Sequence, residues 1–420
     1  MSVNAQGYDP FDIRVCPCPA CGCHAAAPFF DGGEQPLATL AWPASAAEAR
    51  SMKNLPLDFV RCISCGHIFN SQFTYEDVPY SDKPNLMFNS GKLWVDFIQN
   101  VQSDILSLLP ERPVVAEIGY GDGSFLASLA EARPEGRYVG FDPHGATSDS
   151  NLLDLRQELF DPVKHLVSLR PDILVSRHVL EHITNPMGFL QKISCVAAAM
   201  RISVMAYFEV PCIDRVLKSG RTADFYYEHS SQFTTESFTR MLESSFSEIS
   251  RIGHGYDGEV IYGFVRMGER SADRLRHMEE SHDFQISTRL SAETIAQQLD
   301  EIHQSGKRVV IWGGTGKGAA FINRYKADAT RFPIVVDSDA DKKGTYVPGT
   351  GQEIQMPGCL SGEAIDVVIV PTQWRARDIV GEIEQMGLEV GSILIEHDNS
   401  LIDYDAGRHP YRAPDHARAS

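Results

Sequence analysis

The chain has 420 residues, which predicts two or three domains, and its 43% hydrophobic and 22% charged residues are typical of a soluble globular protein. A formal net charge of −18 disfavours sequence-independent binding to nucleic acid, which needs clustered Lys and Arg. Neither a secretory signal nor an apolar run of membrane-spanning length is evident, so we expect a cytoplasmic protein without a membrane partner.

Two Cys-x-x-Cys pairs near the start of the chain predict a metal site. Each pair is followed by glycine, and together they supply four candidate ligands: Cys18, Cys21, Cys62 and Cys65. Four thiolates favour a closed tetrahedral zinc site, which stabilises the fold because it leaves no open position for substrate. Four neighbouring side chains are alternative ligands: Cys16, Cys23, His24 and His67.

Composition and hydrophobic pattern divide the first two thirds of the chain into two segments. Residues 1–80 are rich in Pro, Cys and small residues and predict a zinc-binding module. Residues 81–270 alternate apolar runs of strand length with helical patterns, which predicts an α/β domain with a parallel sheet. The expected strands of this domain are Val114–Ile118, Arg137–Phe141, Ile173–Ser176 and Ile202–Phe208.

The rest of the chain predicts a second α/β unit, residues 271–404, and a tail. A polar stretch of helical pattern, Ser271–Ser305, precedes the apolar run Arg308–Trp312, which is the expected first strand of this unit. Residues 405–420 contain prolines and small polar residues, and we expect them to be disordered.

A glycine-rich turn after the first strand of the 81–270 segment is the first functional signal. Gly119, Gly121 and Gly123 allow a tight turn and a close approach of the backbone to a ligand. Glu117 precedes these glycines, and Asp142 ends the next strand. Carboxylates at these two places suit a ligand with an ammonium group and a ribose diol, and they repel a pyrophosphate.

This combination resembles class I S-adenosyl-L-methionine (SAM)-dependent methyltransferases more than NAD enzymes. Residues 172–183 are similar to the fourth-strand segment of that family, and the resemblance implies that His178 contacts the cofactor. The residues from His178 to His182 also fit the H-x-x-E-H pattern of a zinc peptidase class. We disfavour a peptidase because the motif directly follows a parallel strand and no third ligand is evident. We expect Glu181 and His182 to cap or line the cofactor pocket.

The residues that end the next strand and follow it indicate a particular family of methyltransferases. Phe208-Glu209-Val210-Pro211 ends that strand, and Tyr226-Tyr227-Glu228-His229 follows later. This order resembles the sugar C-methyltransferase family, whose members have a Tyr-x-Glu-His run soon after a Glu-Val-Pro strand end. The resemblance covers about residues 15–403 and implies an N-terminal zinc module, a central SAM domain and a C-terminal Rossmann-like domain. It further implies that His229 is the general base and that Glu228 and Tyr226 orient it and the sugar.

The residue types in this run fit methyl transfer to carbon. Carbon becomes a nucleophile when a proton beside a carbonyl is removed, and a keto-sugar nucleotide of deoxysugar biosynthesis has such protons. Imidazole has a pKa suited to a general base at neutral pH, and the phenol of Tyr226 is a candidate donor to the enolate oxygen. The alternative for Tyr226–His229 is an aromatic loop packed under the SAM domain.

A second glycine cluster, Gly313–Gly318, follows the first strand of the C-terminal unit. Its spacing excludes a Walker A loop, and the next strand ends in Asp337 at roughly the Rossmann distance, so an NAD-linked oxidoreductase of a sugar nucleotide is the rival prediction. The family resemblance instead implies sugar-nucleotide binding, with Gly314, Gly316 and Lys317 as contacts and a helix N-terminus that accepts a phosphate. The alternative for Lys317 is a solvated surface lysine.

Departures from the family pattern concern the cofactor turn and the acceptor. Tyr227 stands where the family commonly has a histidine, and Tyr120 places a bulky ring in the cofactor turn. In the family, aromatic and Ser residues between the zinc module and the SAM domain touch the substrate. The candidates here are Tyr75, Tyr80, Phe88 and Ser90, of which we assign Tyr80 to that role. A SAM-dependent O- or N-methyltransferase of a related activated sugar, or a non-catalytic binding protein, therefore stays open.

The sequence thus predicts an α/β protein with three parts. These are a class I (Rossmann-like) methyltransferase domain, a second, C-terminal Rossmann-like domain and a small N-terminal zinc-binding module. The predicted activity is SAM-dependent C-methylation of a keto-sugar nucleotide, a small-molecule partner, with zinc in a structural role.

Overall fold

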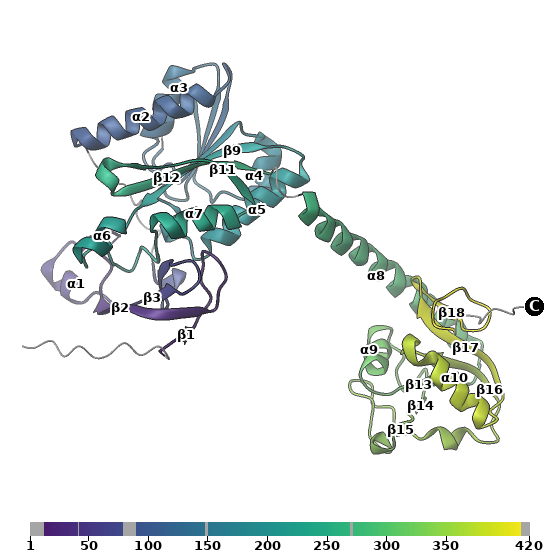
Figure 1. Ribbon diagram of the computed structural model, residues 1–420. Coiled ribbons are helices and arrows are strands. Elements are labelled where there is room, and N and C mark those ends of the chain that lie inside the picture. The colour runs from purple at the N-terminus through teal and green to yellow at the C-terminus, as the bar shows by residue number, and fades with distance from the viewer. Residues whose placement is uncertain (1–11, 41, 79–89, 148–149, 269–271, 413–420) are drawn as a thin grey trace, which may run out of the picture. The chain divides into compact units, whose positions relative to one another are not determined.

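The computed structural model describes residues 12–40, 42–78, 90–147, 150–268 and 272–412 (Figure 1). The chain divides into two compact units, residues 1–276 and 277–420, and the fold is mixed α/β as predicted. Within the described ranges, no helix has both the length and the apolar character needed to cross a membrane.

The first unit begins with a five-stranded antiparallel sheet in the order β1-β2-β3-β4-β10. Its strands and the helix beside them are β1 (Arg14–Val15), β2 (Ala25–Gln35), α1 (Ala46–Arg50), β3 (Leu55–Cys62), β4 (Ile68–Asn70) and β10 (Ser231–Gln232). Although β10 is distant in sequence, Ser231 pairs with Phe69 and Gln232 pairs with Ile68. The strand just after Tyr226–His229 therefore completes the sheet of the N-terminal module.

A seven-stranded sheet in the order β11-β12-β9-β8-β5-β6-β7 forms the centre of the first unit. Its strands are β5 (Val114–Ile118), β6 (Arg137–Phe141), β7 (Leu153–Arg156), β8 (Ile173–Arg177), β9 (Val204–Pro211), β11 (Ser247–Gly255) and β12 (Val260–Met267). Strands β5 to β9 pair in parallel, whereas β12 runs antiparallel to both of its neighbours. The parallel strands β5, β6, β8 and β9 are mostly apolar because helices bury both faces of the sheet, whereas the edge strand β7 is only partly buried.

Helices α2 and α3 pack on one face of this sheet, and α4, α5 and α7 pack on the other (Figure 1). The helices of this unit are α2 (Lys92–Leu108), α3 (Ser124–Ala132), α4 (Pro162–Leu169), α5 (Pro186–Ala199), α6 (Asp214–Ser219) and α7 (Thr235–Ser244), with 3-10 turns η1 (Tyr75–Asp77), η2 (Leu180–His182) and η3 (Tyr256–Gly258). In α2 the buried residues Trp94, Phe97, Val101 and Ile105 recur at helical spacing, so one stripe of the helix faces the sheet.

The second unit contains a six-stranded sheet in the order β15-β14-β13-β16-β17-β18. Helix α8 (Ala272–Gln304) begins in the first unit and continues into the second. The other elements of the second unit are β13 (Val309–Trp312), α9 (Lys317–Arg324), β14 (Ile334–Val336), η4 (Ala340–Lys342), β15 (Ile354–Gln355), η5 (Pro357–Leu360), β16 (Ile365–Val370), η6 (Gln373–Arg375), α10 (Ala376–Gln385), β17 (Val390–His397) and β18 (Ser400–Asp403). All neighbouring strands are parallel except β18, so the sheet is Rossmann-like. Ile295 and Leu299 of α8 are fully buried in its core.

The predicted tail falls partly within the described residues. In residues 405–412, Tyr411 packs on the apolar cluster that contains Tyr404. The Tyr404 hydroxyl donates to the carbonyl oxygen of Tyr411 at 3.2 Å. Residues 413–420 lie outside the described residues.

Candidate active site and metal site

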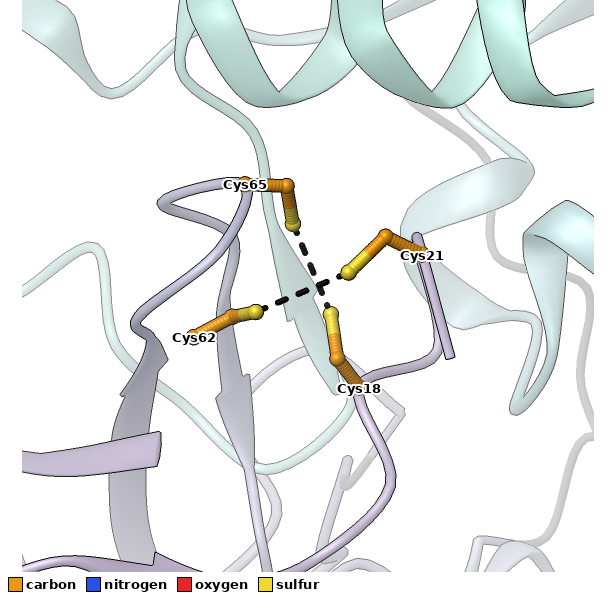
Figure 2. A group of neighbouring side chains, drawn as sticks. All are labelled: Cys18, Cys21, Cys62 and Cys65. Atoms are coloured by element: carbon orange, nitrogen blue, oxygen red, sulfur yellow. Dashed lines mark hydrogen bonds between the residues drawn. The ribbon is translucent and has the colours of Figure 1, made fainter. Parts of the chain in front are cut away.

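The two cysteine pairs meet in the N-terminal module (Figure 2). Sγ of Cys18 lies 3.6 Å from Sγ of Cys65, Sγ of Cys21 lies 3.6 Å from Sγ of Cys62, and the four sulfur atoms are within 4.8 Å of one another. Tetrahedral zinc with Zn–S bonds of about 2.3 Å places its sulfur ligands about 3.8 Å apart. The geometry of the four side chains therefore fits a zinc ion.

Local backbone geometry explains why each pair forms a ligand turn. The glycines that follow the pairs, Gly22 and Gly66, have φ of 74° and 72°, a conformation that side chains disfavour. The Ser64 N–H points to Sγ of Cys62 at 3.4 Å, as expected for a turn that supports a thiolate. The four alternative ligands are outside this group of sulfurs: Cys16, Cys23, His24 and His67.

The glycine turn after β5 depends on its glycines. Gly119, Gly121 and Gly123 have φ of 76°, 57° and 76°, and a Cβ at Gly119 would lie 2.3 Å from Cγ2 of Val179. The Gly119 N–H donates to the carbonyl oxygen of Phe141 at 2.7 Å, which ties the turn to β6. The turn thus exposes backbone where a larger residue would be strained.

The ring of Tyr120 is accommodated without distorting this turn. It is 4% exposed, and a Cβ at Gly140 or Gly145 would lie 2.6 or 2.3 Å from it. Two glycines in neighbouring segments therefore make the space for this ring.

The two predicted acids lie beside the turn. Glu117 is 2% exposed, and its Oε2 has no hydrogen-bond partner. Burial raises the pKa of Glu117 to about 8, although the Arg177 guanidinium opposes the shift. Asp142 accepts hydrogen bonds from the N–H groups of Gly121 at 3.0 Å and His144 at 2.9 Å. A buried carboxylate with an unpaired oxygen fits a cationic ligand group.

A cavity of about 1160 Å³ opens along the carboxyl ends of the parallel strands. Most of the predicted site residues of the first unit line it: Glu117, Gly119, Gly121, Asp142, His178, Tyr226 and His229. Glu181 and His182 also line it, in agreement with the expectation for that segment. Gly123 and Glu228 are not among the lining residues, and Gly123 instead caps α3.

A buried charge network forms one wall of the cavity. Arg177 Nη2 donates to Oε1 of Glu209 at 3.3 Å, and His178 lies 3.0 Å from the same oxygen and 3.4 Å from Oε1 of Glu181. Burial alone lowers the pKa of His178, but the two carboxylates outweigh it and raise the pKa to about 9. His178 is therefore a cation at neutral pH.

The backbone in this region rules out the zinc-peptidase arrangement. Strand β8 ends at Arg177, His178 has φ of 53°, and Leu180–His182 forms a single 3-10 turn. His178 and His182 consequently do not share one face of an α-helix, which the peptidase motif requires.

Tyr226 and His229 form a hydrogen-bonded pair in the cavity wall. The Tyr226 hydroxyl lies 2.8 Å from Nε2 of His229, and the ring of His182 lies 4.8 Å from the His229 ring. Burial, followed by the neighbouring His182 and His178, lowers the pKa of His229 well below its usual value. Burial raises the pKa of Tyr226. His229 is therefore neutral and Tyr226 protonated at neutral pH.

Tyr227 and Glu228, which lie between Tyr226 and His229 in the sequence, contact the N-terminal module. The buried Glu228 carboxylate accepts hydrogen bonds from the N–H groups of Ala38, Thr39 and Leu40. The hydroxyl of Tyr227 accepts a hydrogen bond from the Thr74 N–H at 2.9 Å.

The second glycine turn lies in the second unit. The Gly314 N–H donates to Oδ2 of Asp337 at 3.3 Å, and Nζ of Lys342 lies 3.1 Å from the same oxygen. Gly316 has φ of 57° and precedes α9, and Nζ of Lys317 lies 5.6 Å from the ring of Trp374. The turn combines a positive side chain with a helix N-terminus.

Sequence reasoning missed several residues of the cavity wall. Thr39 and Trp42 line the cavity from the N-terminal module, and Arg177 and Asn185 line it from the central domain. Arg177 lies within the segment 172–183 but was given no role there, and tertiary contacts alone bring Thr39 and Trp42 to the site. The predicted substrate contact Tyr80 lies outside the described residues.

Comparison with sequence families gives two matches. Residues 94–245 match the family described as "Methyltransferase domain", and residues 265–396 match the family described as "C-methyltransferase C-terminal domain". No curated protein matches the chain.

Solved methyltransferase structures are similar to part of the chain. A SAM-dependent methyltransferase from Aquifex aeolicus has 12% identity and a TM-score of 0.29, covering 43% of this chain and 100% of that one. The magnesium protoporphyrin IX methyltransferase from Synechocystis, with bound SAH, has 13% identity and a TM-score of 0.31, covering 44% and 90%. The 1,6-didemethyltoxoflavin-N1-methyltransferase from Burkholderia thailandensis has 16% identity and a TM-score of 0.31, covering 42% and 82%.

The family matches and the strand order lead to the same conclusion. The central sheet has a class I methyltransferase topology, and the matched family covers that region. The chain is a methyltransferase with a methyltransferase domain at residues 94–245 and a C-methyltransferase C-terminal domain at residues 265–396.

Proposed function

We propose that this methyltransferase transfers the methyl group of SAM to a carbon atom beside the ketone of a keto-sugar nucleotide. The observation that carries the proposal is the Tyr226–His229 pair, hydrogen-bonded at 2.8 Å in the same cavity as Gly119 and Gly121. Methylation of carbon needs a proton acceptor beside the cofactor, because carbon must lose a proton before it becomes a nucleophile. The C-methyltransferase match of residues 265–396 supports this chemistry.

His229 is the proposed proton acceptor. Its lowered pKa keeps the ring neutral in the free protein, as a base requires. In the tautomer with hydrogen on Nε2, His229 donates to the Tyr226 hydroxyl oxygen and retains a lone pair on Nδ1. That lone pair takes the proton from the substrate carbon, and the C–H electrons form the enolate.

Tyr226 is the proposed donor to the enolate oxygen. Its raised pKa keeps the phenol protonated at neutral pH, so its O–H is available for donation. The oxygen can accept from His229 and donate to the enolate simultaneously, because a hydroxyl has both functions. The negative charge that forms on the enolate oxygen is then stabilised by this hydrogen bond.

The cofactor's ammonium group is assigned to Glu117 and its ribose diol to Asp142. SAM supplies the electrophilic methyl group when it is bound. The unpaired Oε2 of Glu117 fits an ammonium group, and the exposed backbone of Gly119 and Gly121 allows close approach. His178 lines the same cavity and completes the proposed cofactor contacts.

We propose that the second unit has a binding site for the phosphate of a nucleotide. Gly314 and Gly316 form the turn before α9, and Lys317 begins this helix. Backbone N–H groups at a helix N-terminus and a lysine ammonium both attract phosphate. We also propose three domains, residues 1–80, 81–270 and 271–404, from the sequence pattern.

Solvent deuterium exchange into the acceptor tests the base directly. A dTDP-linked 4-keto-6-deoxyhexose is incubated in D2O with the protein, and its mass is followed with and without SAM. We expect His229→Asn to slow exchange and methylation by about 1000-fold, the range typical of a general base. Tyr226→Phe, which keeps the ring, should lower both by about 100-fold.

Two results would redirect the proposal. Undiminished exchange by His229→Asn would remove His229 from the base role. Methyl transfer without any exchange of carbon-bound hydrogen would indicate an O- or N-methyltransferase. Calorimetry with NAD beside SAM tests the oxidoreductase alternative, which requires tighter binding of NAD.

Zinc is the proposed ion of the four-cysteine site, where it stabilises the fold. Four reduced thiolates are also compatible with the proposed cytoplasmic location. We expect one zinc per chain by elemental analysis. Cys62→Ser should lose the ion and lower the free energy of unfolding by more than about 3 kcal/mol, whereas Cys23→Ser should retain it. Retention of zinc by Cys62→Ser would contradict the assignment.

A further inference from the structure

We propose that Glu228 is a positioning residue that holds the N-terminal module against the cavity, so that Thr39 and Trp42 form a wall of the acceptor site. This inference rests on the proposed function, because it assigns this part of the cavity to the acceptor. It differs from the family-based expectation, in which Glu228 orients His229 and the sugar.

The environment of the Glu228 carboxylate supports this role. Oε1 accepts from the N–H groups of Ala38, Thr39 and Leu40 at 2.8, 2.7 and 3.1 Å, and the Thr39 hydroxyl adds a contact at 3.2 Å. Three successive backbone N–H groups around one carboxylate form an anion-binding nest. The side chain is fully buried, so this pairing is not exchanged for water.

Neighbouring residues of the same run also face the module. Phe225 packs against Phe30 and Phe59 with ring centroids 5.1 and 5.2 Å apart. Tyr227 is 1% exposed and holds the Thr74 backbone, next to the cavity-lining Tyr75. The side chains of residues 225–229 therefore face two ways. Tyr226 and His229 line the cavity, while Phe225, Tyr227 and Glu228 contact the N-terminal module.

The segment that Glu228 holds reaches the cavity. Thr39, whose N–H binds Glu228, is itself a lining residue, and so is Trp42, whose Nε1 donates to the Thr39 carbonyl oxygen at 3.0 Å. Trp42 is 69% exposed and lines the cavity with an aromatic residue that the N-terminal module supplies. An aromatic residue of this kind suits contact with a ring of the acceptor. Loss of the carboxylate should loosen this wall and leave the Tyr226–His229 pair in place.

Hydrogen–deuterium exchange of the backbone tests the contact without any ligand. In Glu228→Gln, the amides of Ala38, Thr39 and Leu40 should exchange at least about tenfold faster, since an amide accepts fewer of these hydrogen bonds than a carboxylate. Tyr227→Phe is the matched control from the same run. It should accelerate exchange at Thr74 and leave residues 38–40 unchanged. Unchanged exchange at 38–40 in Glu228→Gln would overturn the proposal.

Steady-state kinetics with the dTDP-linked 4-keto-6-deoxyhexose distinguish positioning from a direct effect on the base. Glu228→Gln should raise the acceptor KM about tenfold, with kcat within about threefold of wild type and the pH profile of kcat unchanged. A lower kcat with an unchanged KM, and a shifted pH profile of kcat, would assign Glu228 to His229 instead.

The wall can also be tested without altering Glu228. Because its side chain is mostly exposed, Trp42→Ala should fold normally and raise the acceptor KM with little change in kcat. An unchanged KM would remove Trp42 from the acceptor site. If wild-type protein methylates none of the tested keto-sugar nucleotides, the proposed function fails, while the backbone exchange experiment still decides whether Glu228 holds residues 38–40.

Discussion

The two glycine turns of the chain share a backbone plan and differ in chemistry. Each follows a central parallel strand, and its first glycine, Gly119 or Gly313, donates to the adjacent strand at 2.7 Å. A second N–H in each turn donates to the acid after the next strand, to Asp142 in the first unit and Asp337 in the second. The same type of glycine turn thus occurs twice along the chain.

The side chains around the turns set different ligand preferences. Two residues before its first glycine, the first turn has the buried Glu117, whose Oε2 lacks a hydrogen-bond partner, whereas the second has the apolar Ile311. Asp337 is paired with Lys342 at 3.1 Å, and this ammonium competes with any ribose diol for the carboxylate. The glycines therefore define the turn, while the buried acid of the first turn defines a site for a cationic ligand.

Among the substitutions in the two turns, Glu117→Gln should change the affinity for SAM most. Replacement of the carboxylate removes a charge-assisted contact to the SAM ammonium group, so we expect the Kd for SAM to rise about 100-fold by calorimetry. Lys317→Met, in the other turn, is the control and should leave SAM affinity unchanged. Equal losses in both variants would show that the two turns do not divide the ligands as proposed.

Proton release on SAM binding examines the same carboxyl group. With its pKa raised to about 8, Glu117 is mostly protonated in the free protein at pH 7, whereas pairing with an ammonium group requires the carboxylate. SAM binding at pH 7 should therefore release close to one proton, and affinity should rise as pH increases from 6 to 8. Calorimetry in buffers of different ionisation enthalpy measures this, and Glu117→Gln should abolish the release.

Parallel substitutions of the two strand-end acids should give a smaller effect. Asp142→Asn weakens the proposed ribose contact and should raise the Kd for SAM about tenfold. Asp337→Asn loses the Lys342 ion pair and should leave the Kd for SAM unchanged. A tenfold loss in Asp337→Asn alone would place SAM in the second unit.

Local sequence patterns predicted much of the fold. The strands Val114–Ile118 and Arg137–Phe141 have the predicted limits, because apolar runs bounded by glycine and polar residues are typical of buried strands. Strand β9 differs, since it begins at Val204 and extends to Pro211, where pairing with β12 continues it. Pairing partners thus decided this end of the strand.

The candidate site was predicted less completely. Tyr226, Glu228 and His229 are adjacent in sequence, and the family resemblance assigned all of them to catalysis. The structure places the tyrosine and histidine in the cavity wall and the glutamate against residues 38–40. Trp42 and Thr39 carried no signal, because no local spacing relates them to the catalytic run.

The sequence by itself determined the features that depend on near neighbours: the Cys-x-x-Cys turns, the glycine turns and the acids beside them. Backbone sterics and ligand spacing act within a few residues, so a pattern suffices to predict them. Only the tertiary structure excluded the alternative metal ligands and decided which way Glu228 faces. Its partners are separated from it by 188 to 190 residues in the chain, and packing of the N-terminal module is what brings them together.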